Sequence, residues 1–283
     1  YNQLFNIWTF KFIPIKDAKD IINNKLTQKI DYKKLFSRLG VQEGDMLYIA
    51  SNILPLILNF KKNKINFNSD NLINNLKESV GKNGTLLFPT YNWDFCKKKT
   101  FNYLKTPSKC GALTNLVLKR DDFKRTKHPI YSLAVWGKYK KYLCGLNNKS
   151  SWGQGSPFDF MYKKSCKNIF IGIDYKDAFT MDHYFEQKVK VNYRYNKTFT
   201  SAYIDEFGKK KLKNYTMFVR KEDLCKSTKI SKLLDTKLLK NKSLKKLRFK
   251  NVLFSLINLK NTSKIIIADL KKKNSKLIFP EYK

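Results

Sequence analysis

The sequence predicts a single α/β domain in which helices alternate with buried strands. The chain has 283 residues, of which 42% are hydrophobic, so it can bury a sizeable core without metal ions or disulfides. A helix, a glycine-containing turn and a short apolar run follow one another twice before residue 90, which favours an α/β sheet. No internal repeat, proline-rich linker or abrupt change of composition divides residues 1–283. We therefore expect one domain with a less regular C-terminal lobe.

Two helix–strand pairs open the series. An aspartate precedes each helix, Asp31 and Asp70, and its carboxylate can accept a hydrogen bond from the first turn. Gly40 is placed to end the first helix, and apolar residues at helical spacing mark the second. The expected elements are a helix at 32–39, a strand at 46–50, a helix at 70–80 and a strand at 85–88.

The remaining elements follow in a less regular order. Ser156 and Pro157 are typical of the start of a helix, with the serine as its cap, and another helix is expected to open at Thr180, whose hydroxyl can cap it or reach a pocket. The expected helices lie at 111–119, after 157, from 180 onward and at 231–239, and the expected strands at 133–136, 169–173, 216–219, 252–255 and 264–267.

Cysteine and histidine usage argues against a metal site or a disulfide framework. The five cysteines are widely spaced, no CxxC pair occurs, and the two histidines lie far from any cysteine pair in the sequence. We therefore expect no bound metal and a reducing compartment. No apolar run approaches the ~20 residues that span a bilayer, and the N-terminal residues lack the basic-then-apolar layout of a signal peptide. These features predict a cytoplasmic protein without a membrane span.

The formal net charge of +36 has two explanations. One is a functional field that attracts an anion, such as a nucleotide-linked metabolite, an acidic carrier protein, a lipid or a nucleic acid. The other is coding bias, because the chain is rich in lysine and asparagine and poor in arginine. The lysines are scattered rather than gathered with arginines and aromatics in one motif, so we favour bias over a nucleic-acid site.

Residues 167–186, KNIFIGIDYKDAFTMDHYFE, form the stretch around which we interpret the rest of the chain. An apolar run leads into a polar loop, and the helix that follows carries His183 and Glu186. A strand, a loop and a helix in this order can present a general base over a pocket, and a neutral imidazole suits that task at physiological pH. Glu186 lies at i+3 on the same helix face and can fix the tautomer. A histidine that merely stands beside a glutamate would show the same spacing, so both interpretations stay open.

Six sequence blocks in a fixed order place this stretch in a wider pattern. They are GVQEGDMLYIASN, VGKNGTLLFPTY, TPSKCGAL, HPIYSLAVWG, GQGSPFDFMY and IFIGIDYKDAFTMDHYFE. Together they resemble the aminoglycoside N3-acetyltransferase-like family of antibiotic acetyltransferases, whose fold is not the GNAT fold. The resemblance implies a three-layer α/β/α arrangement around a mixed β-sheet. It also implies acetyl-CoA or another acyl-CoA as the donor and an amine on a sugar as the acceptor.

The resemblance implies roles for individual residues as well. The T-x-x-H-x-x-E pattern of the family falls on Thr180, His183 and Glu186, with His183 as the base that takes a proton from the attacking amine. Ala50-Ser51-Asn52 stands where the family usually has a His-Ser-Ser run, a departure that bears on the coenzyme contacts. The implied coenzyme-binding positions are Ser51, Asn52, Thr90, Thr106, Pro107, Ser108 and Gly111.

Other polar residues in these blocks have more than one interpretation. Asp182 points about 100° away from His183 on an ideal helix, so it can bind an acceptor hydroxyl or amine, or simply favour the positive helix N-terminus. His128 can contact the substrate or hold a loop by a hydrogen bond. Cys110 has the chemistry of an acyl-carrying nucleophile, but we interpret it as a small apolar residue. Ser156 lies outside any GxSxG elbow, and no GxxxxGK[ST] or GxGxxG loop occurs.

The charge balance bears on the acceptor. Aminoglycosides are polycations, which 58 basic against 22 acidic residues would repel at long range, whereas a nucleotide-linked amino sugar is an anion. We therefore expect acyl transfer to a nucleotide-linked amino sugar used in surface polysaccharide or glycan biosynthesis. Two alternatives stay open: an aminoglycoside resistance enzyme, and a non-catalytic protein of the same fold that binds an anion. An acyl carrier protein is a second conceivable donor, and the sequence does not predict the oligomeric state.

Overall fold

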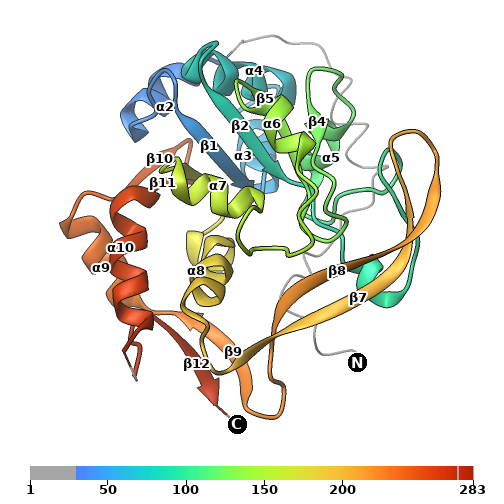
Figure 1. Cartoon of the computed structure of the whole chain (residues 1–283). Helices are drawn as coiled ribbons and strands as arrows, with labels where there is room; N and C mark the ends of the chain where they lie inside the picture. The colour runs from blue at the N-terminus through green and yellow to red at the C-terminus, as the bar shows by residue number, and fades with distance from the viewer. Residues whose placement is uncertain (1–29, 273, 283) are drawn as a thin grey trace.

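A mixed seven-stranded β-sheet forms the middle layer of the protein in a computed structural model that describes residues 30–272 and 274–282 (Figure 1). Its strand order is β10-β11-β6-β1-β2-β5-β4. The central strands β6, β1 and β2 are parallel, and an antiparallel pair extends each side. The strands are β1 (Met46–Ser51), β2 (Thr85–Pro89), β4 (Lys124–Arg125), β5 (Leu133–Gly137), β6 (Lys167–Ile171), β10 (Leu244–Phe249) and β11 (Val252–Asn258).

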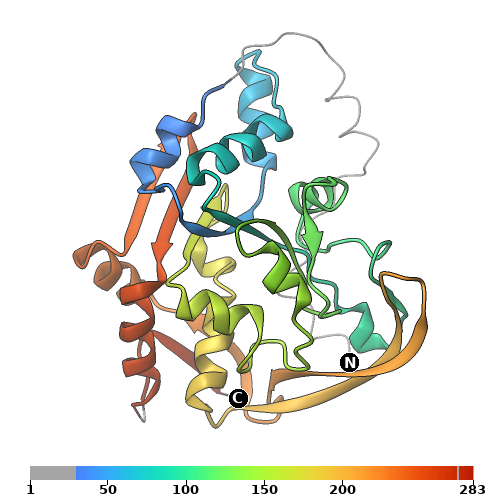
Figure 2. The same ribbon diagram turned by 45° about the horizontal axis from the view of Figure 1, so that its top comes forward.

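Helices cover both faces of this sheet, which confirms the predicted three-layer α/β/α arrangement (Figures 1 and 2). One helical layer consists of α2 (Lys33–Leu39), α3 (Leu54–Lys62), α4 (Ser69–Val80) and α5 (Ala112–Leu118). The other consists of α6 (Lys140–Gly145), α7 (Pro157–Lys163), α8 (Met181–Val189), α9 (Lys232–Lys240) and α10 (Leu259–Leu270).

The side chains of the central strands point alternately to the two faces of the sheet, and this explains why the protein has two hydrophobic cores. In β1, Leu47 and Ile49 belong to the core shared with α2 to α5, while Met46, Tyr48 and Ala50 belong to the core shared with α6 to α10. Successive side chains of a strand point to opposite faces, so one buried strand supplies both layers. The α8 side of the sheet is therefore the side on which Tyr48 meets the stretch containing His183.

A long antiparallel hairpin lies outside the central sheet and crosses the lower part of the molecule in Figure 1. Its strands are β7 (Arg194–Ile204) and β8 (Lys210–Arg220), and the short strand β3 (Phe101–Asn102) pairs with the end of β7. The 3₁₀ helices η2 (Trp93–Lys97) and η3 (Tyr175–Asp177) lie in loops, and β9 (Cys225–Ile230) pairs with β12 (Ile278–Tyr282).

Several expected helix boundaries agree with the structure, and two do not. Gly40 ends α2 with φ 99°, and Ser156 caps α7 by accepting from the Asp159 N–H at 3.2 Å. Asp70 was the wrong cap for α4: the cap is Asn68, whose side chain accepts from the Asn71 N–H, because the helix begins at Ser69 and Asp70 already lies in its first turn. Thr180 stands at the cap position of α8, but its hydroxyl makes no capping bond there.

The strand expected at 264–267 is wrong, because this segment lies inside α10. Three consecutive isoleucines resemble a buried strand locally. The buried positions Leu259, Thr262, Ile266 and Leu270 nevertheless follow helical spacing, and the Asn258 side chain caps the helix. The strand expected at 169–173 begins and ends two residues earlier, at 167–171, and the helix α3 and the strand β10 were not expected.

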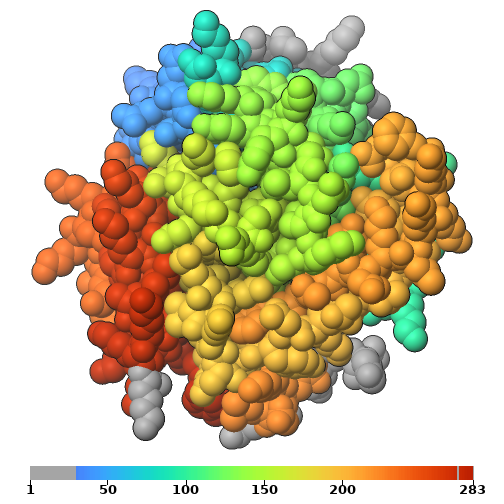
Figure 3. All heavy atoms as spheres, viewed as in Figure 1, coloured from blue at the N-terminus to red at the C-terminus, as the bar shows by residue number. Residues whose placement is uncertain are grey.

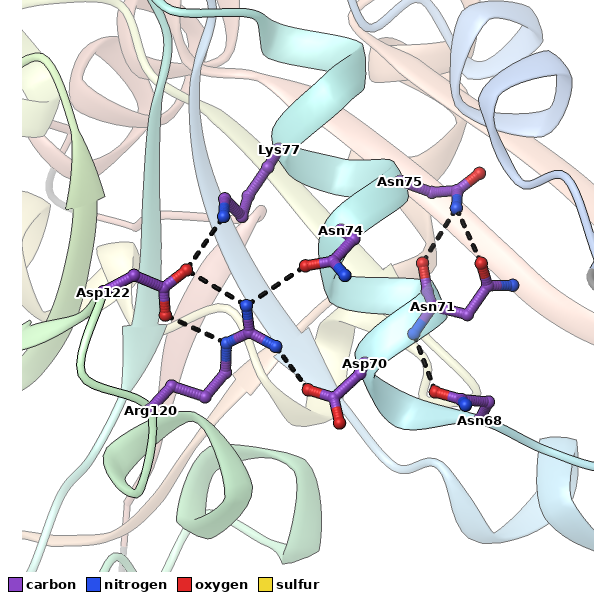
Figure 4. A network of polar contacts seen from close by, with 8 residues as sticks. All are labelled: Asn68, Asp70, Asn71, Asn74, Asn75, Lys77, Arg120 and Asp122. Atoms are coloured by element: carbon purple, nitrogen blue, oxygen red, sulfur yellow. Dashed lines mark hydrogen bonds and ion pairs between the residues drawn. The ribbon is translucent and has the colours of Figure 1, made fainter.

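On the α2–α5 side, a network of polar contacts joins α4 to the loop after α5 (Figure 4). The Arg120 guanidinium forms ion pairs with Asp70 and Asp122 and donates to Asn74 at 3.1 Å. Lys77 Nζ lies 2.8 Å from the other Asp122 oxygen. Hydrogen bonds from Arg120 and Lys77 lower the pKa of Asp122 to about 2. This network ties α4 to the loop after α5 at a partly exposed surface.

No helix in the described ranges is long and apolar enough to cross a membrane. The expectation about a signal peptide concerns residues 1–29, which lie outside the described residues. The single domain spanning 1–283 stays a prediction.

Candidate active site

The loop after β6 brings α8 back over the sheet. Gly172 follows the strand with φ 65°, and a Cβ at this position would stand 2.2 Å from the Asn52 carbonyl oxygen. A side chain is therefore excluded both by the left-handed conformation and by the close backbone approach. The Asn52 N–H in turn donates to the Ile171 carbonyl at 2.8 Å. The ends of β1 and β6 are thus locked together where α8 begins.

Glu186 is the buried centre of the candidate site. Its side chain is fully buried and accepts from the Tyr193 hydroxyl at 2.9 Å, while Arg194 Nε lies 2.8 Å from Oε2. His183 Nδ1 lies 3.2 Å from the same Oε2. Burial alone would raise the pKa of Glu186, but Arg194 and His183 outweigh it, so the pKa lies below its ordinary value. Glu186 is an ionised carboxylate at neutral pH.

His183 is held by two carboxylates on one edge of its ring. Besides Glu186, Asp182 Oδ1 lies 3.3 Å from Nδ1. When Nδ1 carries the proton and donates to a carboxylate, the neutral ring has its lone pair on Nε2, which can then accept a proton. The His183 side chain is 24% exposed, so a substrate can reach it. This pairing on i and i+3 is the geometry that the sequence predicted.

Asp182 lies closer to the base than an ideal helix predicts. Its carboxylate turns back to accept from the His183 backbone N–H at 2.6 Å, which brings it beside the His183 ring rather than 100° away. The same N–H also donates to the Thr180 carbonyl at 3.3 Å, and the positive N-terminal end of a helix attracts a carboxylate. Burial raises the pKa of Asp182 to about 6. The site therefore holds one firmly ionised carboxylate and one that titrates near neutrality.

A pocket lies beside the N-terminal end of α8. Thr180 borders it, and the Thr180 hydroxyl lies 3.4 Å from the Tyr48 hydroxyl, which is 2.8 Å from that of Tyr91. The lining residues are Tyr48, Ala50, Ser51, Pro89, Tyr91, Trp93, Lys109, Cys110, Ile173, Ala178 and Thr180. The wall is mostly apolar and aromatic with a few hydroxyl groups, which is the usual character of a small-molecule site.

A chain of tilted aromatic rings connects this pocket to His183. The ring centroids of His183 and Trp152 lie 4.8 Å apart, those of Trp152 and Tyr131 4.5 Å, and those of Tyr131 and Tyr91 4.5 Å. Tyr91 lines the pocket, whereas Tyr131, Trp152 and His183 are not among its lining residues. The buried rings of Tyr131 and Trp152 therefore connect the pocket wall to His183.

The residues expected to contact the coenzyme fall into two groups. Ser51 lines the pocket, and its buried Oγ has no hydrogen-bond partner among the described residues. Such an orphaned group favours a ligand that bonds to it. Asn52 beside it instead caps the start of α3, accepting from the Leu54 N–H at 3.2 Å. Gly111 stands close to this point, since a Cβ there would lie 3.6 Å from the Ser51 carbonyl.

The second group holds the loops around the pocket. Thr90 is buried and bonds Ser132 Oγ at 2.9 Å, and the Thr106 hydroxyl accepts from the Asn102 N–H at 2.7 Å. Ser108 accepts from the Thr114 hydroxyl at 2.8 Å and from the Cys110 N–H at 3.0 Å. Pro107 is exposed, and its carbonyl accepts from Asn92. These side chains shape the wall, and their polar groups are engaged within the protein.

The geometry favours a structural role for His128, which holds a loop by hydrogen bonds, and for Cys110, which is a small, partly buried residue. His128 is buried, and its Nδ1 accepts from the backbone N–H groups of Ile130 and Tyr131 at 3.3 and 3.1 Å. Burial lowers the pKa of His128 to about 3, so it is neutral. Burial also raises the pKa of the Cys110 thiol to about 12. A thiol that does not ionise is a poor nucleophile.

Sequence reasoning missed Arg194 and Tyr193, which complete the Glu186 environment. Both lie just after α8, where the chain turns into β7. The Arg194 side chain also reaches the Phe218 carbonyl and the Thr228 hydroxyl, each at 3.3 Å. No local pattern indicates that this segment folds back under the helix, so the sequence held no signal for it.

The fold and the site together define an α/β/α protein in which a histidine held by carboxylates lies near a largely apolar pocket. Comparison with known proteins shows the family of this protein. The family model described as aminoglycoside 3-N-acetyltransferase matches residues 61–270, and the chain belongs to that family. The resemblance stated from the sequence is confirmed.

Individual relatives are distant. The chain is 22% identical over 209 residues to the SPbeta prophage-derived aminoglycoside N(3')-acetyltransferase-like protein YokD of Bacillus subtilis, covering 66% of this chain and 73% of the relative. It is similar to the structure of sisomicin-bound AAC-VIa, with TM-score 0.71, 17% identity and coverage of 87% of this chain and 98% of the other. AAC-IIIb in its binary complex with CoASH gives TM-score 0.71 at 14% identity, covering 88% and 98%. At these identities the structures show a shared fold.

These findings correct the acceptor that we expected from the sequence. The family is named for aminoglycosides, and nothing in the comparisons supports a nucleotide-linked acceptor or a role in polysaccharide biosynthesis. The alternative that the sequence left open, an aminoglycoside N-acetyltransferase, fits better. The physical reason for the error is that a net charge describes the long-range field, whereas acceptor binding depends on the few groups beside the base.

Proposed function

We propose that the protein transfers the acetyl group of acetyl-CoA to an amine of an aminoglycoside. The observation that carries this proposal is His183, which the buried Glu186 holds on its Nδ1 edge and which a chain of aromatic ring contacts joins to the pocket wall. The family of the chain and the CoASH-bound neighbour AAC-IIIb support an acetyl-CoA donor. The sisomicin-bound neighbour AAC-VIa supports the acceptor class.

The proposed reaction is a direct acyl transfer. The acceptor amine attacks the thioester carbonyl, His183 Nε2 takes the proton from that amine, and the coenzyme thiolate leaves. Glu186 stabilises the imidazolium that forms, and its own charge is fixed by Arg194 at 2.8 Å. General-base assistance of this kind contributes ~10²–10⁴ in rate. In the proposal the Thr180 hydroxyl at the pocket border orients the reactants and Ser51 Oγ bonds the donor, which is supported by the position of both residues in the pocket lining and by the absence of a partner for Ser51 Oγ among the described residues.

Local charge favours a cationic acceptor even though the whole chain is basic. Asp182 and Glu186 are the acidic groups at the base, and Asp182 keeps a partly exposed edge. In the proposal Asp182 binds a second ammonium group of the acceptor. Exposed charges more than about 8 Å away are screened at physiological salt, so the excess of lysines acts mainly on the approach of the substrate. An acyl carrier protein as donor has no support in the comparisons.

Thiol release from acetyl-CoA with a panel of acceptors tests this function. The panel contains sisomicin, kanamycin-type aminoglycosides and nucleotide-linked amino sugars. We expect turnover on at least one aminoglycoside and none on the nucleotide sugars. Turnover on the nucleotide sugars alone would overturn the acceptor class and leave the base intact. A protein that does not bind coenzyme at all would overturn the proposed reaction.

A further inference from the structure

The free end of the β7–β8 hairpin carries an unusual surface. Phe207, Leu212 and Leu104 are exposed to 80%, 77% and 71%, the three highest values for large hydrophobic side chains in the described part of the chain. Leu104 follows β3, Phe207 lies in the hairpin turn and Leu212 lies on β8. The free end of the hairpin lies at the right-hand edge in Figures 1 and 3. Scattered exposed apolar residues need no explanation, but three together on one protruding tip do.

The strand pairing places these side chains at the same end of the three-stranded sheet β3-β7-β8. Leu212 is paired with Ala202 on the hairpin, and Phe207 stands in its turn. Leu104 follows β3, which pairs in parallel with the end of β7, and the Tyr103 N–H donates to the Ile204 carbonyl at 2.9 Å. The loop after β3 and the hairpin turn therefore end side by side. We call Leu104, Phe207 and Leu212 the apolar tip.

Two similar turns hold the apolar tip in place. Asp205 Oδ1 accepts from the N–H groups of Phe207 and Lys209, at 3.0 and 2.9 Å. Asn102 Oδ1 accepts from the N–H groups of Leu104 and Lys105, both at 3.0 Å. Side-chain oxygens that bond the backbone two and three or four residues further on fix such turns. The apolar side chains are thus presented outward by ordered backbone.

Basic residues surround the apolar tip. The acidic side chains present are already engaged, Asp205 with the turn and Glu206 with Lys127 at 3.4 Å. The exposed lysines next to the tip are Lys105, Lys209, Lys210 and Lys211. A few protruding apolar side chains with a ring of lysines suit the interface of an anionic bilayer, where the former enter the headgroup region and the latter meet lipid phosphates.

We propose that the hairpin end of this protein binds the surface of an anionic membrane, with Phe207, Leu212 and Leu104 inserted among the headgroups. A bilayer needs no complementary shape, which suits a narrow tip. A protein partner would need roughly 800 Å² of its own surface covered, more than three side chains supply. A nucleic acid would be read by aromatic faces in a basic groove, and the tip is convex with one aromatic ring. The inference does not depend on the proposed acetyl transfer.

Vesicle co-sedimentation tests the proposal with matched variants. The full chain is mixed with vesicles of phosphatidylcholine, with or without about one third phosphatidylglycerol. Phe207→Asp and Leu212→Asp are compared with Leu58→Asp, which makes the same charge change at an exposed leucine on α3. We expect binding only to the anionic vesicles, at least about tenfold weaker in each tip variant and near wild type in Leu58→Asp.

Several outcomes would overturn the proposal. Equal losses in the tip variants and in Leu58→Asp would mean that the net charge alone draws the chain to anionic lipid. No binding to either vesicle, or a tip-dependent binding of duplex DNA in place of vesicles, would contradict it too. Quenching by brominated lipid gives an independent readout: a tryptophan placed by Phe207→Trp is expected to be quenched, and one placed by Leu58→Trp is not. Absence of that difference would exclude insertion.

Discussion

The charged cluster around Glu186 and the one around Arg120 are built from the same kinds of groups in different surroundings. In the first, Glu186 is fully buried and the Arg194 side chain is 6% exposed. In the second, the carboxylates of Asp122 and Asp70 are 32% and 66% exposed (Figure 4). A pair removed from water depends strongly on every partner, whereas a pair in contact with water can replace a lost partner with solvent.

The two clusters also differ in how the bonds of their charged groups are distributed. Around Arg120, the guanidinium and the Asp122 carboxylate are bonded to one another and to α4 side chains, which holds α4 against the loop after α5. Around Glu186, one carboxylate oxygen accepts from Tyr193 and the other lies against both Arg194 and His183. The difference teaches that one network only joins two segments of the fold, whereas the other holds a histidine ring to which we propose a catalytic role.

Glu186→Gln should have the largest effect on stability. The substitution leaves the Arg194 charge buried without its counter-ion, which costs about 3–5 kcal/mol in the free energy of unfolding. The native pKa of Glu186 is lowered, so its contribution to stability is present above the unfolded pKa and is lost as pH falls through the native value. Urea unfolding should therefore show a gap between the variant and wild type at pH 7 that narrows below about pH 4. A gap under about 1 kcal/mol at pH 7 would contradict the buried pair.

Asp182→Asn should change the free energy of unfolding by an intermediate amount, and it should stabilise the folded protein rather than destabilise it. The Asp182 pKa is about 6 in the native state, above its ordinary value, so ionising the group disfavours the folded protein. The associated stability is fully present below the unfolded pKa near 4 and is lost as pH rises through 6. We expect the variant to be more stable than wild type at pH 8, on the order of 2 kcal/mol, and equal at pH 4. Thermal melts at the two pH values measure this, and a constant difference would contradict the shifted pKa.

Asp122→Asn should cause the smallest change in the free energy of unfolding. The carboxylate is in contact with water and its partners are flexible, so the expected loss is about 0.5–1 kcal/mol. Because screening weakens exposed pairs, wild type and variant should converge in 1 M salt. Urea unfolding at low and high salt measures the difference. A loss as large as that of Glu186→Gln would erase the distinction between the two clusters.

The sequence predicted the parts of the fold whose signals are local. Strands such as β1 and β2 are short apolar runs bounded by turns, and Gly40 and Ser156 end and begin helices by their own backbone chemistry. The error at α10 arose because a run of three adjacent isoleucines is too short to show whether apolar residues recur with helical or strand spacing. Only the buried positions further apart, Leu259 and Leu270 among them, reveal the helix.

The sequence predicted those contacts of the candidate site that follow from residue spacing on one helix. His183 and Glu186 are three residues apart on one helix, so their contact follows from helix geometry. Arg194 and Tyr193 come from the segment that leads into the hairpin, and their contact with Glu186 depends on a chain reversal that no motif marks. The position of Asp182 depends on its hydrogen bond to the His183 backbone N–H in the first helical turn, which residue spacing alone does not show.

The most direct test of the central claim is the turnover number of His183→Ala on an aminoglycoside that the wild type acetylates. Asp122→Asn, whose cluster lies on the other side of the sheet, serves as the control. The account predicts that kcat falls ~10²–10⁴-fold in His183→Ala while coenzyme affinity is kept, and that added imidazole restores part of the rate. A kcat within a few-fold of wild type would show that His183 is not the base.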